Sequence, residues 1–484
     1  MQKSPREPEA AAGVDPNVSR RRFLTGAGVA LGALAAADPA MARALGPGGG
    51  PPPTVYDVTT YGAQGDGVAD DRGAIQAAFN AANEAGGGTI VFPAGTFRVT
   101  GPLTIYSQIV LRGAGLEATT IKKSSGAGSY PVLRSPGFVP GNPPPPPIRS
   151  FSLQNISLDG NRQGGAGGNG MEIYAYGYTL FNTSVANCAA RGIWTEYHDL
   201  LPPDGKPVEA MWLNVIVHNC VGGGVYFNGP HDSQWTNVIV FMCGPPGIAS
   251  GSTTRGVEVG LRGTGLRATN CHSWGLNQAY AWWLDTDGPG LVNCTGEGAE
   301  LAQVVVLGND TQIVGGKYYG ARDDLQAVAI QIGEVGHLGP AGTFVNTKVV
   351  NCNLGALKFV RDRGVGRYIL SVWQTTGSAV VRVPSAAVQL GNRFDIDVNG
   401  GAVAGTDPLA PVTFQENVLA RRDVQLGGTG TRLGLFGAKP AEQSSGWGAT
   451  VPDRRILNDG SDLEAVRNTL GTLITELKRY GLLR

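Results

Sequence analysis

The chain has 484 residues, and its 38 Lys and Arg are balanced by 38 Asp and Glu, so the formal net charge is zero. A neutral chain lacks the excess of basic residues typical of nucleic-acid-binding proteins, and 74 glycines without a three-residue period exclude collagen. The hydrophobic content of 42% is high enough for a folded core, which excludes global disorder.

The N-terminus has the features of an export signal. Residues 19–24 are Ser-Arg-Arg-Arg-Phe-Leu, residues 26–37 are apolar, and small residues recur at cleavage-site spacing over 40–44. This pattern resembles a twin-arginine signal peptide. The apolar run is shorter than the roughly 20 residues that span a bilayer. We therefore expect a signal over residues 1–44, a Gly/Pro linker over 45–54, and a secreted or cell-surface protein without a membrane span.

The segment after the linker predicts short strands around one helix. Ile75, Phe79 and Ala82 are spaced at i, i+4 and i+7, so they share one face of a helix. Asp70 is placed to cap its start, and the glycines at 86–88 end it. An amphipathic helix at this place would cover the apolar end of a stack of strands.

Five short motifs stand out between residues 61 and 161: Tyr61–Gly67, Asp70-Asp71, Ala74–Gln76, Val91–Phe97 and Ile156–Asn161. They resemble motifs of the pectate-lyase superfamily, which includes rhamnogalacturonase-like, polygalacturonase-like and phage-tailspike-like proteins. The resemblance covers about residues 55–375 and implies an all-β fold, a right-handed parallel β-helix over 55–400 with its N-terminal cap over 55–123. The polygalacturonase motifs Gly-His-Gly and Asn-Thr-Asp are absent from the sequence, so no family site residue carries over.

The six cysteines share a local context that predicts one coil per repeat. Successive cysteines are 32, 23, 28, 23 and 58 residues apart, which fits coils of varying loop length. An Asn at a corner tolerates left-handed backbone and can hydrogen-bond along the stack. We expect all six thiols at one structural position, pointing inward and free, with disulfides as the alternative. Asn precedes Cys188, Cys220, Cys271, Cys294 and Cys352, and Met242 precedes Cys243.

A second strand is predicted after each corner. Because successive side chains of a strand point to opposite faces of the sheet, the sequence indicates which of them point inward and which outward. Stacked in neighbouring coils, the outward side chains would form acids flanked by aromatic rings, a surface suited to sugar rings. The inward set is Ile193, Thr195, Val225, Phe227, Val257, Val259 and Leu284. The outward set is Trp194, Glu196, Tyr226, Asn228, Glu258, Trp283 and Asp285.

The outward acids are candidate catalytic residues, because glycoside hydrolysis uses two carboxyl groups. Glu258 and Asp285 are expected one coil apart, about 5 Å, and Glu196 and Glu258 two coils apart, about 10 Å. Asp287 and His198 lie where strands enter loops and would assist substrate binding. The simpler alternative is that these are ordinary solvated residues on an exposed face.

A lyase would need different groups. Its base would come from residues such as Arg191, Arg255 or Lys317, and Ca²⁺ would neutralise a uronate. No acidic cluster in the sequence is dense enough to predict a calcium site, so no cofactor or metal is expected.

The tail over residues 401–484 differs in character. Residues 434–440 resemble a short motif of phage tail and fibre proteins. Asp462 precedes a predicted helix over 461–480 with an a/d heptad pattern. Two interpretations stay open: a helix that packs on its own domain, or a stalk that forms a homotrimer.

Three functional hypotheses follow. The first is a secreted carbohydrate-active enzyme that cleaves a polysaccharide, as a glycoside hydrolase or a polysaccharide lyase. The second is a non-catalytic glycan-binding adhesin or a structural protein similar to a phage tail fibre. The third is a structural surface protein without a sugar ligand.

Overall fold

A computed structural model gives the structure of the chain. The chain divides into two units, Met1–Pro52 and Pro53–Arg484, and all described residues lie in the second. The predicted signal, the linker up to residue 53 and the C-terminal helix lie outside the described residues, so export and trimer formation stay predictions. The described residues are 54–399, with gaps at 142–143, 145, 199–206, 246–252, 321–326, 334–341, 353, 361–365, 374–380 and 383–392, and two short strands at 432–433 and 441–442.

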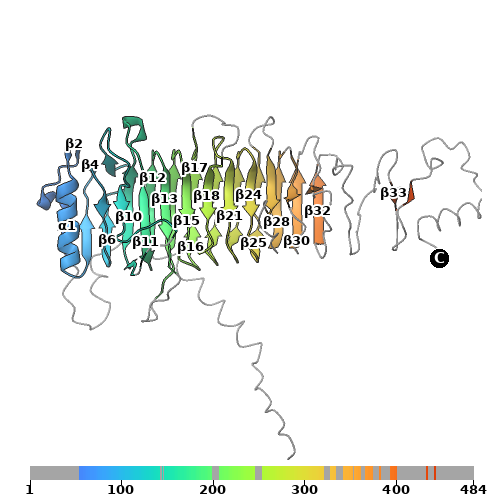
Figure 1. Cartoon of the computed structure of the whole chain (residues 1–484), viewed down its shortest axis with the longest axis horizontal. Coiled ribbons are helices and arrows are strands. Elements are labelled where there is room, and N and C mark those ends of the chain that lie inside the picture. The colour runs from blue at the N-terminus through green and yellow to red at the C-terminus, as the bar shows by residue number, and fades with distance from the viewer. Residues whose placement is uncertain are drawn as a thin grey trace, which may run out of the picture. The chain divides into compact units, whose positions relative to one another are not determined.

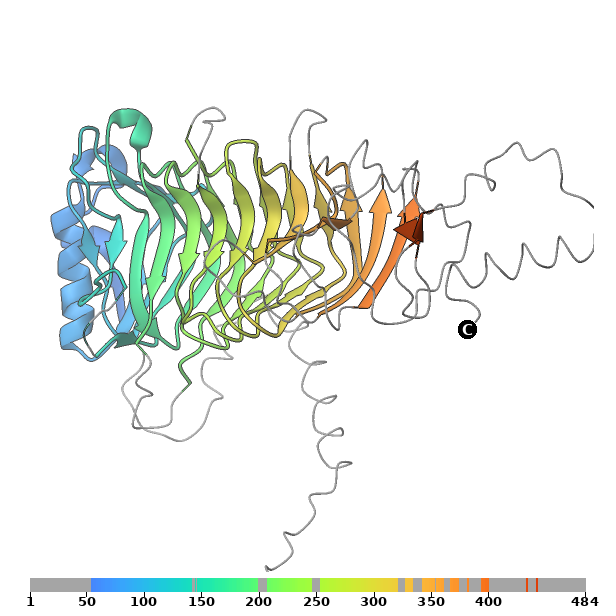
Figure 2. The same cartoon turned by 45° about the vertical axis from the view of Figure 1, so that its right-hand side comes forward.

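The described strands stack in parallel, coil upon coil, as Figures 1 and 2 show from the blue to the orange end. They form a 20-stranded sheet, here sheet A, and a 12-stranded sheet, here sheet B. Only β33 (Arg432–Leu433) and β34 (Ala441–Glu442) pair antiparallel among the described strands. The predicted right-handed parallel β-helix is confirmed.

The element bounds are as follows. Sheet A contains β1 (Val55–Asp57), β2 (Asp66–Asp70), β3 (Gly88–Val91), β4 (Gly95–Val99), β6 (Ile109–Arg112), β7 (Thr119–Lys123), β10 (Ser152–Asp159), β12 (Thr179–Ala186), β14 (Met211–His218), β16 (Gln234–Thr236), β17 (Ile239–Phe241), β19 (Arg267–Thr269), β20 (His272–Trp274), β22 (Gly290–Val292), β23 (Thr295–Glu297), β25 (Thr311–Val314), β26 (Lys317–Tyr319), β28 (Gly342–Val350), β30 (Gly366–Trp373) and β32 (Arg393–Asn399). Sheet B contains β5 (Leu103–Thr104), β8 (Leu133–Arg134), β9 (Ile148–Arg149), β11 (Met171–Tyr176), β13 (Arg191–Glu196), β15 (Gly223–Phe227), β18 (Arg255–Val259), β21 (Tyr280–Leu284), β24 (Ala302–Val306), β27 (Val328–Ile332), β29 (Leu357–Phe359) and β31 (Val381–Arg382). The helices are α1 (Arg72–Glu84) and the 3₁₀ turns η2 (Val58–Tyr61) and η3 (Arg162–Gly164).

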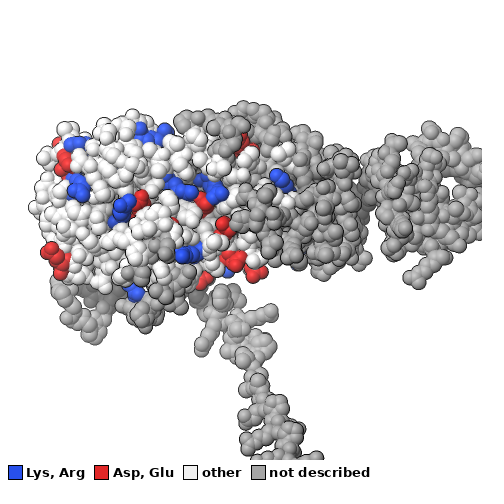
Figure 3. Space-filling model, in the orientation of Figure 1, with Lys and Arg blue, Asp and Glu red and all other residues white. Residues whose placement is uncertain are grey.

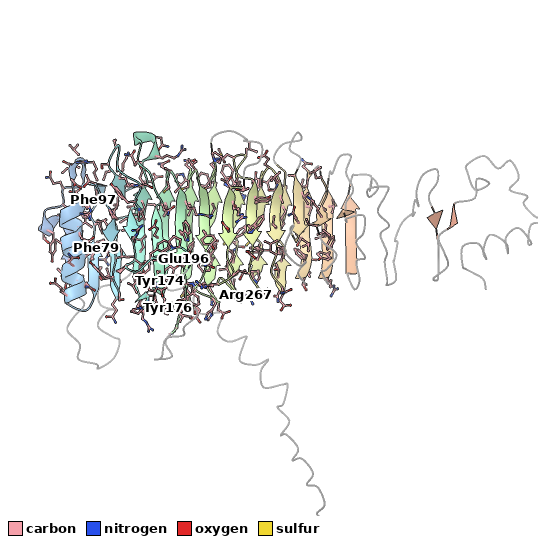
Figure 4. The ribbon with its side chains drawn as sticks, viewed as in Figure 1. Phe79, Phe97, Tyr174, Tyr176, Glu196 and Arg267 are labelled. Carbon is pink, nitrogen blue, oxygen red and sulfur yellow. The ribbon has the colours of Figure 1, made fainter. Side chains whose placement is uncertain are left out.

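Helix α1 covers the first coil, as predicted. Its residues Ile75, Phe79 and Ala82 are fully buried, and Figure 4 shows Phe79 and Phe97 at this end of the stack. The residue directly before the helix is Asp71, and the Asp70 carboxylate accepts a hydrogen bond from the first helical N–H group, that of Arg72, at 3.2 Å, as a capping residue does. Asp71 accepts hydrogen bonds from the Gln64 and Gly65 backbone N–H groups, so its carboxylate secures the preceding turn instead of capping the helix.

The six cysteines are buried and free, as expected, but the prediction of one shared position is wrong. Cys188, Cys220, Cys243 and Cys352 follow the ends of β12, β14, β17 and β28, where the chain leaves sheet A. Cys271 and Cys294 stand at the bend inside sheet A, between β19 and β20 and between β22 and β23. Both bends have a residue with left-handed backbone, an Asn in five of these six cases and Met242 in the sixth, followed by a buried side chain, so the Asn-Cys dipeptide occurs at two places.

Stacked rings line the outer face of sheet A. The rings of His218 and Phe241 are 4.8 Å apart and parallel within 2°, and those of Phe241 and Trp274 are 5.1 Å apart and parallel within 6°. Burial lowers the pKa of His218 below its usual 6.5. Burial also lowers the pKa of His272, more than nearby Glu297 raises it. Both imidazoles are therefore mainly neutral in the folded chain near pH 7.

The two depressed histidine pKa values predict a loss of stability in weak acid. Below pH 6.5 the unfolded chain binds more protons than the folded chain, so stability falls as the pH drops through this value. The thermal midpoint is expected to be lower at about pH 5.5 than at about pH 7.5. His218→Phe keeps a ring in the stack and should show a smaller drop. An equal drop in the variant would contradict the assignment to His218.

Candidate functional site

A column of outward-facing side chains crosses sheet B. Its members are register partners in successive coils, on strands β11, β13, β15, β18 and β21. The column contains Glu172, Trp194, Tyr226, Glu258 and Trp283. The residues predicted to point inward are buried, which confirms the predicted alternation: Ile193, Thr195, Val225, Phe227, Val257, Val259 and Leu284.

The predicted separations in coils hold, since β18 pairs with β21 and β15 lies between β13 and β18, but the predicted shared column of the acids is wrong. Glu258 is the register partner of Trp283, so Asp285 lies two residues beyond the position expected for it. Glu196 likewise falls in a neighbouring column, because its partner on β11 is Tyr174 while Trp194 pairs with Glu172. A slip of two residues keeps every side chain on its predicted face, so alternation alone could not detect it.

Two arginines converge on Glu258. The Arg191 Nη1 atom lies 2.7 Å from the Glu258 Oε2 atom, and the Arg255 Nη1 atom contacts the other carboxylate oxygen. Arg191 reaches from two coils away, across Gly223, which occupies the register position between the two arginines. The Glu258 side chain is 10% exposed and each arginine 24%, so this cluster is desolvated yet open on one side.

Aromatic rings flank the guanidinium groups. The Arg191 guanidinium lies 4.9 Å from the Tyr226 ring centroid and 5.4 Å from that of Trp194. The Arg255 guanidinium lies 3.8 Å from the Trp283 ring centroid. These cation–π contacts hold both arginines in fixed orientations at a partly buried site.

Tyr226 is the most chemically distinctive group of the column. Burial, and then the Glu196 and Glu258 carboxylates, raise its pKa to about 12, so the phenol keeps its proton at neutral pH. A side chain at Gly260 would lie 3.0 Å from the hydroxyl oxygen and 2.7 Å from the Asn228 amide oxygen. The absence of a side chain there leaves room around the Tyr226 hydroxyl.

Glu196 is enclosed by hydrogen-bond donors. Its carboxylate accepts from Trp194 Nε1 at 2.8 Å, from Asn228 Nδ2 at 2.7 Å and from the Gly141 backbone N–H at 2.8 Å. The residue is 1% exposed, and Figure 4 shows it next to Tyr174 on sheet B. This position gives Glu196 no open side toward a substrate.

Residues 135–141, here called the strap, fold over this part of sheet B. Besides the Gly141 contact with Glu196, the Arg262 Nη1 atom donates to the Gly141 carbonyl at 2.9 Å. The Phe138 ring packs edge-on against Trp194, with centroids 6.0 Å apart. The strap therefore contacts Glu196 and the Trp194 end of the column, whereas Tyr226 stays partly exposed.

Two histidines, His198 and His231, follow the carboxyl ends of the sheet B strands β13 and β15. His231 Nδ1 is 2.9 Å from Asp232 Oδ2, and its ring meets Tyr197 edge-on at 5.4 Å. The His198 carbonyl accepts from the Tyr176 hydroxyl at 2.6 Å. Asp287 accepts from the Asn309 backbone N–H at 2.6 Å, so the structure places it in a turn contact between coils.

The basic residues Arg191 and Arg255 were not predicted to belong to the outward face of the sheet B strands. Arg191 and Arg255 were considered only as isolated bases, although an Arg-Gly dipeptide opens both strands and marks their common position. Arg134 pairs with Glu172 in the same column, with the Nε atom 2.6 Å from Oε2. Lys317 lies on β26 in sheet A, away from this site. Figure 3 shows basic and acidic atoms side by side on the visible face.

Among the described residues, no group of three or more His, Cys, Asp or Glu is arranged to hold a metal ion. None of the described helices is long and apolar enough to cross a membrane.

The N-terminal part of the chain is similar in sequence to known proteins. Residues 55–147 match the family model described as rhamnogalacturonase A/epimerase, pectate lyase-like, which confirms the predicted resemblance. Mannuronan C5-epimerase AlgE6 of Azotobacter vinelandii is 42% identical over 117 residues, 22% of this chain and 12% of that protein. Alginate lyase 7 of the same organism is 35% identical over 116 residues, 22% of this chain and 13% of that protein. The chain thus matches only about an eighth of these relatives.

Further matches extend over more of the chain. The preneck appendage protein of Bacillus phage PZA is 28% identical over 193 residues, 37% of this chain and 21% of that protein. The solved A-module of Azotobacter vinelandii mannuronan C5-epimerase AlgE4 superposes with a TM-score of 0.55 at 18% identity, covering 74% of this chain and 100% of the module. At that identity the structural likeness establishes the fold alone.

Proposed function

We propose that this chain acts on an acidic polysaccharide built from uronate units, on the outer face of sheet B. The observation that supports this proposal most directly is that Arg191 and Arg255 both form ion pairs with Glu258, next to the protonated hydroxyl of Tyr226. The names of the N-terminal relatives, mannuronan C5-epimerases and an alginate lyase, support a uronate as the substrate.

The arginines suit a sugar carboxylate. A guanidinium has five N–H donors, and the contacts of Arg191 and Arg255 with Glu258 use Nη1 of each. The remaining donors offer the planar, paired geometry that binds carboxylates. Trp194, which is partly exposed beside Arg191, provides a ring surface for the apolar side of a pyranose, whereas the buried Trp283 ring supports the Arg255 guanidinium.

The reaction we propose is proton transfer at the carbon next to the sugar carboxylate. Guanidinium groups on that carboxylate would stabilise the negative charge that develops when the C–H proton leaves. A base takes this proton, and an acid completes the reaction. Return of a proton to the opposite face gives an epimer, whereas protonation of the departing glycosidic oxygen gives an unsaturated chain end.

We assign the acid step to Tyr226 and the base step to His231, which follows the same strand, β15. Tyr226 is the acid because it is the register partner of Glu258, its side chain stands over the Arg191 guanidinium, and its hydroxyl carries a proton at neutral pH. Asp232 can only accept a hydrogen bond, so the hydrogen resides on His231 Nδ1 and Nε2 is the basic atom. Hydrolysis by Glu258 and Asp285 has less support, since both Glu258 oxygens contact arginine and Asp285 is out of register.

An isotope experiment tests the proposal. The mature chain is incubated in D₂O with polymannuronate, polygalacturonate and a neutral glucan. Deuterium at C5 by NMR reveals proton abstraction, and absorbance of an unsaturated product reveals elimination. We expect one of these signals on a uronate polymer and neither on the glucan. Release of reducing ends without deuterium or unsaturation would instead establish hydrolysis and refute this assignment.

A non-catalytic role is the second candidate. It is favoured by the sequence match to the phage preneck appendage protein, which covers 37% of the chain, whereas the sequence match to the epimerase AlgE6 covers 22%. Glycan binding without deuterium incorporation, unsaturated product or new reducing ends would support this role.

A further inference from the structure

A second arginine–glutamate pair lies on the outer face of sheet B, outside the residues that the proposed reaction uses. The Arg134 Nε atom lies 2.6 Å from the Glu172 Oε2 atom, and the Arg134 Nη2 atom contacts the same oxygen. The other carboxylate oxygen of Glu172 accepts a hydrogen bond from Asn169 Nδ2 at 2.8 Å. The Glu172 side chain is 9% exposed and that of Arg134 is 45% exposed. An incoming ligand therefore meets the positive member of this pair first.

This pair stands in the same column as Glu258. Arg134, Glu172, Trp194, Tyr226 and Glu258 are register partners on β8, β11, β13, β15 and β18, which are neighbouring strands of sheet B. Three coil spacings therefore separate Glu172 from Glu258, a distance of about 14 Å. A carboxylate fixes an arginine at each end of this interval.

Two aromatic rings lie between the two ends of the interval. Trp194 and Tyr226 occupy the two intervening coils, with ring centroids 5.4 Å apart. Phe138 of the strap meets Trp194 edge-on, yet both rings of the column keep part of their surface exposed. Aromatic rings offer contact surface to the apolar side of a pyranose. The surface between the two arginine sites therefore suits the sugar units of a bound chain.

The Arg134 guanidinium has more hydrogen-bond donors than its contacts with Glu172 use. Those contacts involve Nε and Nη2, and the guanidinium has two further N–H groups on Nη1. Arginine binds carboxylates through such paired N–H groups. Because Glu172 fixes the orientation of the guanidinium before a ligand arrives, the entropic cost of binding a carboxylate is reduced.

We propose that Arg134 binds the carboxylate of a second uronate unit, three units along the polymer from the unit held by Arg191 and Arg255. One unit of an extended 1,4-linked pyranose chain is about as long as the coil spacing, roughly 5 Å. The three coil spacings from Glu172 to Glu258 therefore correspond to three units, and the polymer lies along the axis of the β-helix. The shortest oligomer that reaches both sites has four units. This inference rests on the proposed function, because it gives the course and minimum length of the same substrate.

Binding of uronate oligomers of defined length tests this inference. The full chain is titrated by calorimetry with oligomannuronates and oligogalacturonates of two to six units. We expect the affinity to rise about tenfold or more between three and four units in at least one series, as one added hydrogen-bonded charge contact would give. Arg134→Met should abolish this rise and leave the affinity for the trimer unchanged.

Two further variants separate loss of the contact from misfolding. Arg134→Met leaves the Glu172 carboxylate without its arginine, so the double variant Arg134→Met/Glu172→Gln removes both charges together. The double variant should lack the same rise in affinity, and circular dichroism verifies its fold. Arg112 is an exposed arginine on β6 in sheet A. Arg112→Met removes the same charge away from the column, so it is the matched control and should keep the rise.

The inference is overturned if neither series shows a rise between three and four units in the wild type, or if the rise persists in the folded variants that lack Arg134. Absence of binding by every oligomer would overturn it as well. The isotope experiment then distinguishes the two proposals. Deuterium or an unsaturated product on a uronate polymer would leave the proposed function standing without the Arg134 site, whereas loss of both signals would remove the proposed function too.

Discussion

Replacing Tyr226 with phenylalanine is expected to lower kcat on a uronate polymer by about 100-fold or more, the usual range for loss of a general acid. The substitution removes only the hydroxyl, which carries the proton that we assign to the acid step, since its pKa is raised to about 12. The ring and its contacts with the Arg191 guanidinium and Trp194 stay. KM should therefore change little, and steady-state kinetics on the best polymer measures both constants.

A remote tyrosine supplies the control for this variant. Tyr106 donates its hydroxyl hydrogen to Asn80 near the N-terminal cap, far along the chain from sheet B's central strands. Tyr106→Phe should leave kcat and KM unchanged. If Tyr226→Phe kept wild-type kcat, another group would be the proton donor and the assignment of Tyr226 would fail. A rise in KM at constant kcat would make Tyr226 a binding residue only.

Replacing Glu258 with glutamine is expected to lower the free energy of unfolding by about 2–3 kcal/mol. The variant leaves two guanidinium groups facing a neutral amide at a site where Glu258 is 10% exposed. The arginines are 24% exposed, so solvent screens part of the repulsion and the effect stays below that of a fully buried pair. Urea unfolding at neutral pH measures the change.

A compensating variant separates charge from packing in this cluster. When Arg191→Met, Arg255→Met and Glu258→Leu are combined, no charge is left unpaired, and apolar groups of similar size fill the site. The triple variant should be more stable than Glu258→Gln alone. It should also lose binding of a uronate polymer, since both guanidiniums are gone. A Glu258→Gln variant with wild-type stability would show that the arginines do not depend on this carboxylate.

The amino-acid sequence by itself determined the repeating architecture of the described region. Alternation identified inward residues such as Val225 and Val257, and the spacing of Ile75, Phe79 and Ala82 identified the capping helix. These features follow from local periodicity: a strand repeats every two residues and a helix every 3.6, whatever lies next to them. The free state of the cysteines also followed from local sequence, because stacked thiols rarely reach disulfide geometry.

Only the tertiary structure decided which residues meet. Arg191 and Glu258 are 67 residues apart in the sequence. Their side chains touch because only one coil lies between the coils that carry them, and that coil has a glycine, Gly223, next to Arg191 in register. Asp285 lies two residues beyond the register position that was expected opposite Glu258. The Asn-Cys dipeptide occurs at two different bends of the coil. Local sequence specifies the face of a strand and the conformation of a bend. The register between coils depends on loop lengths and on the stacking of whole coils, which no local pattern contains.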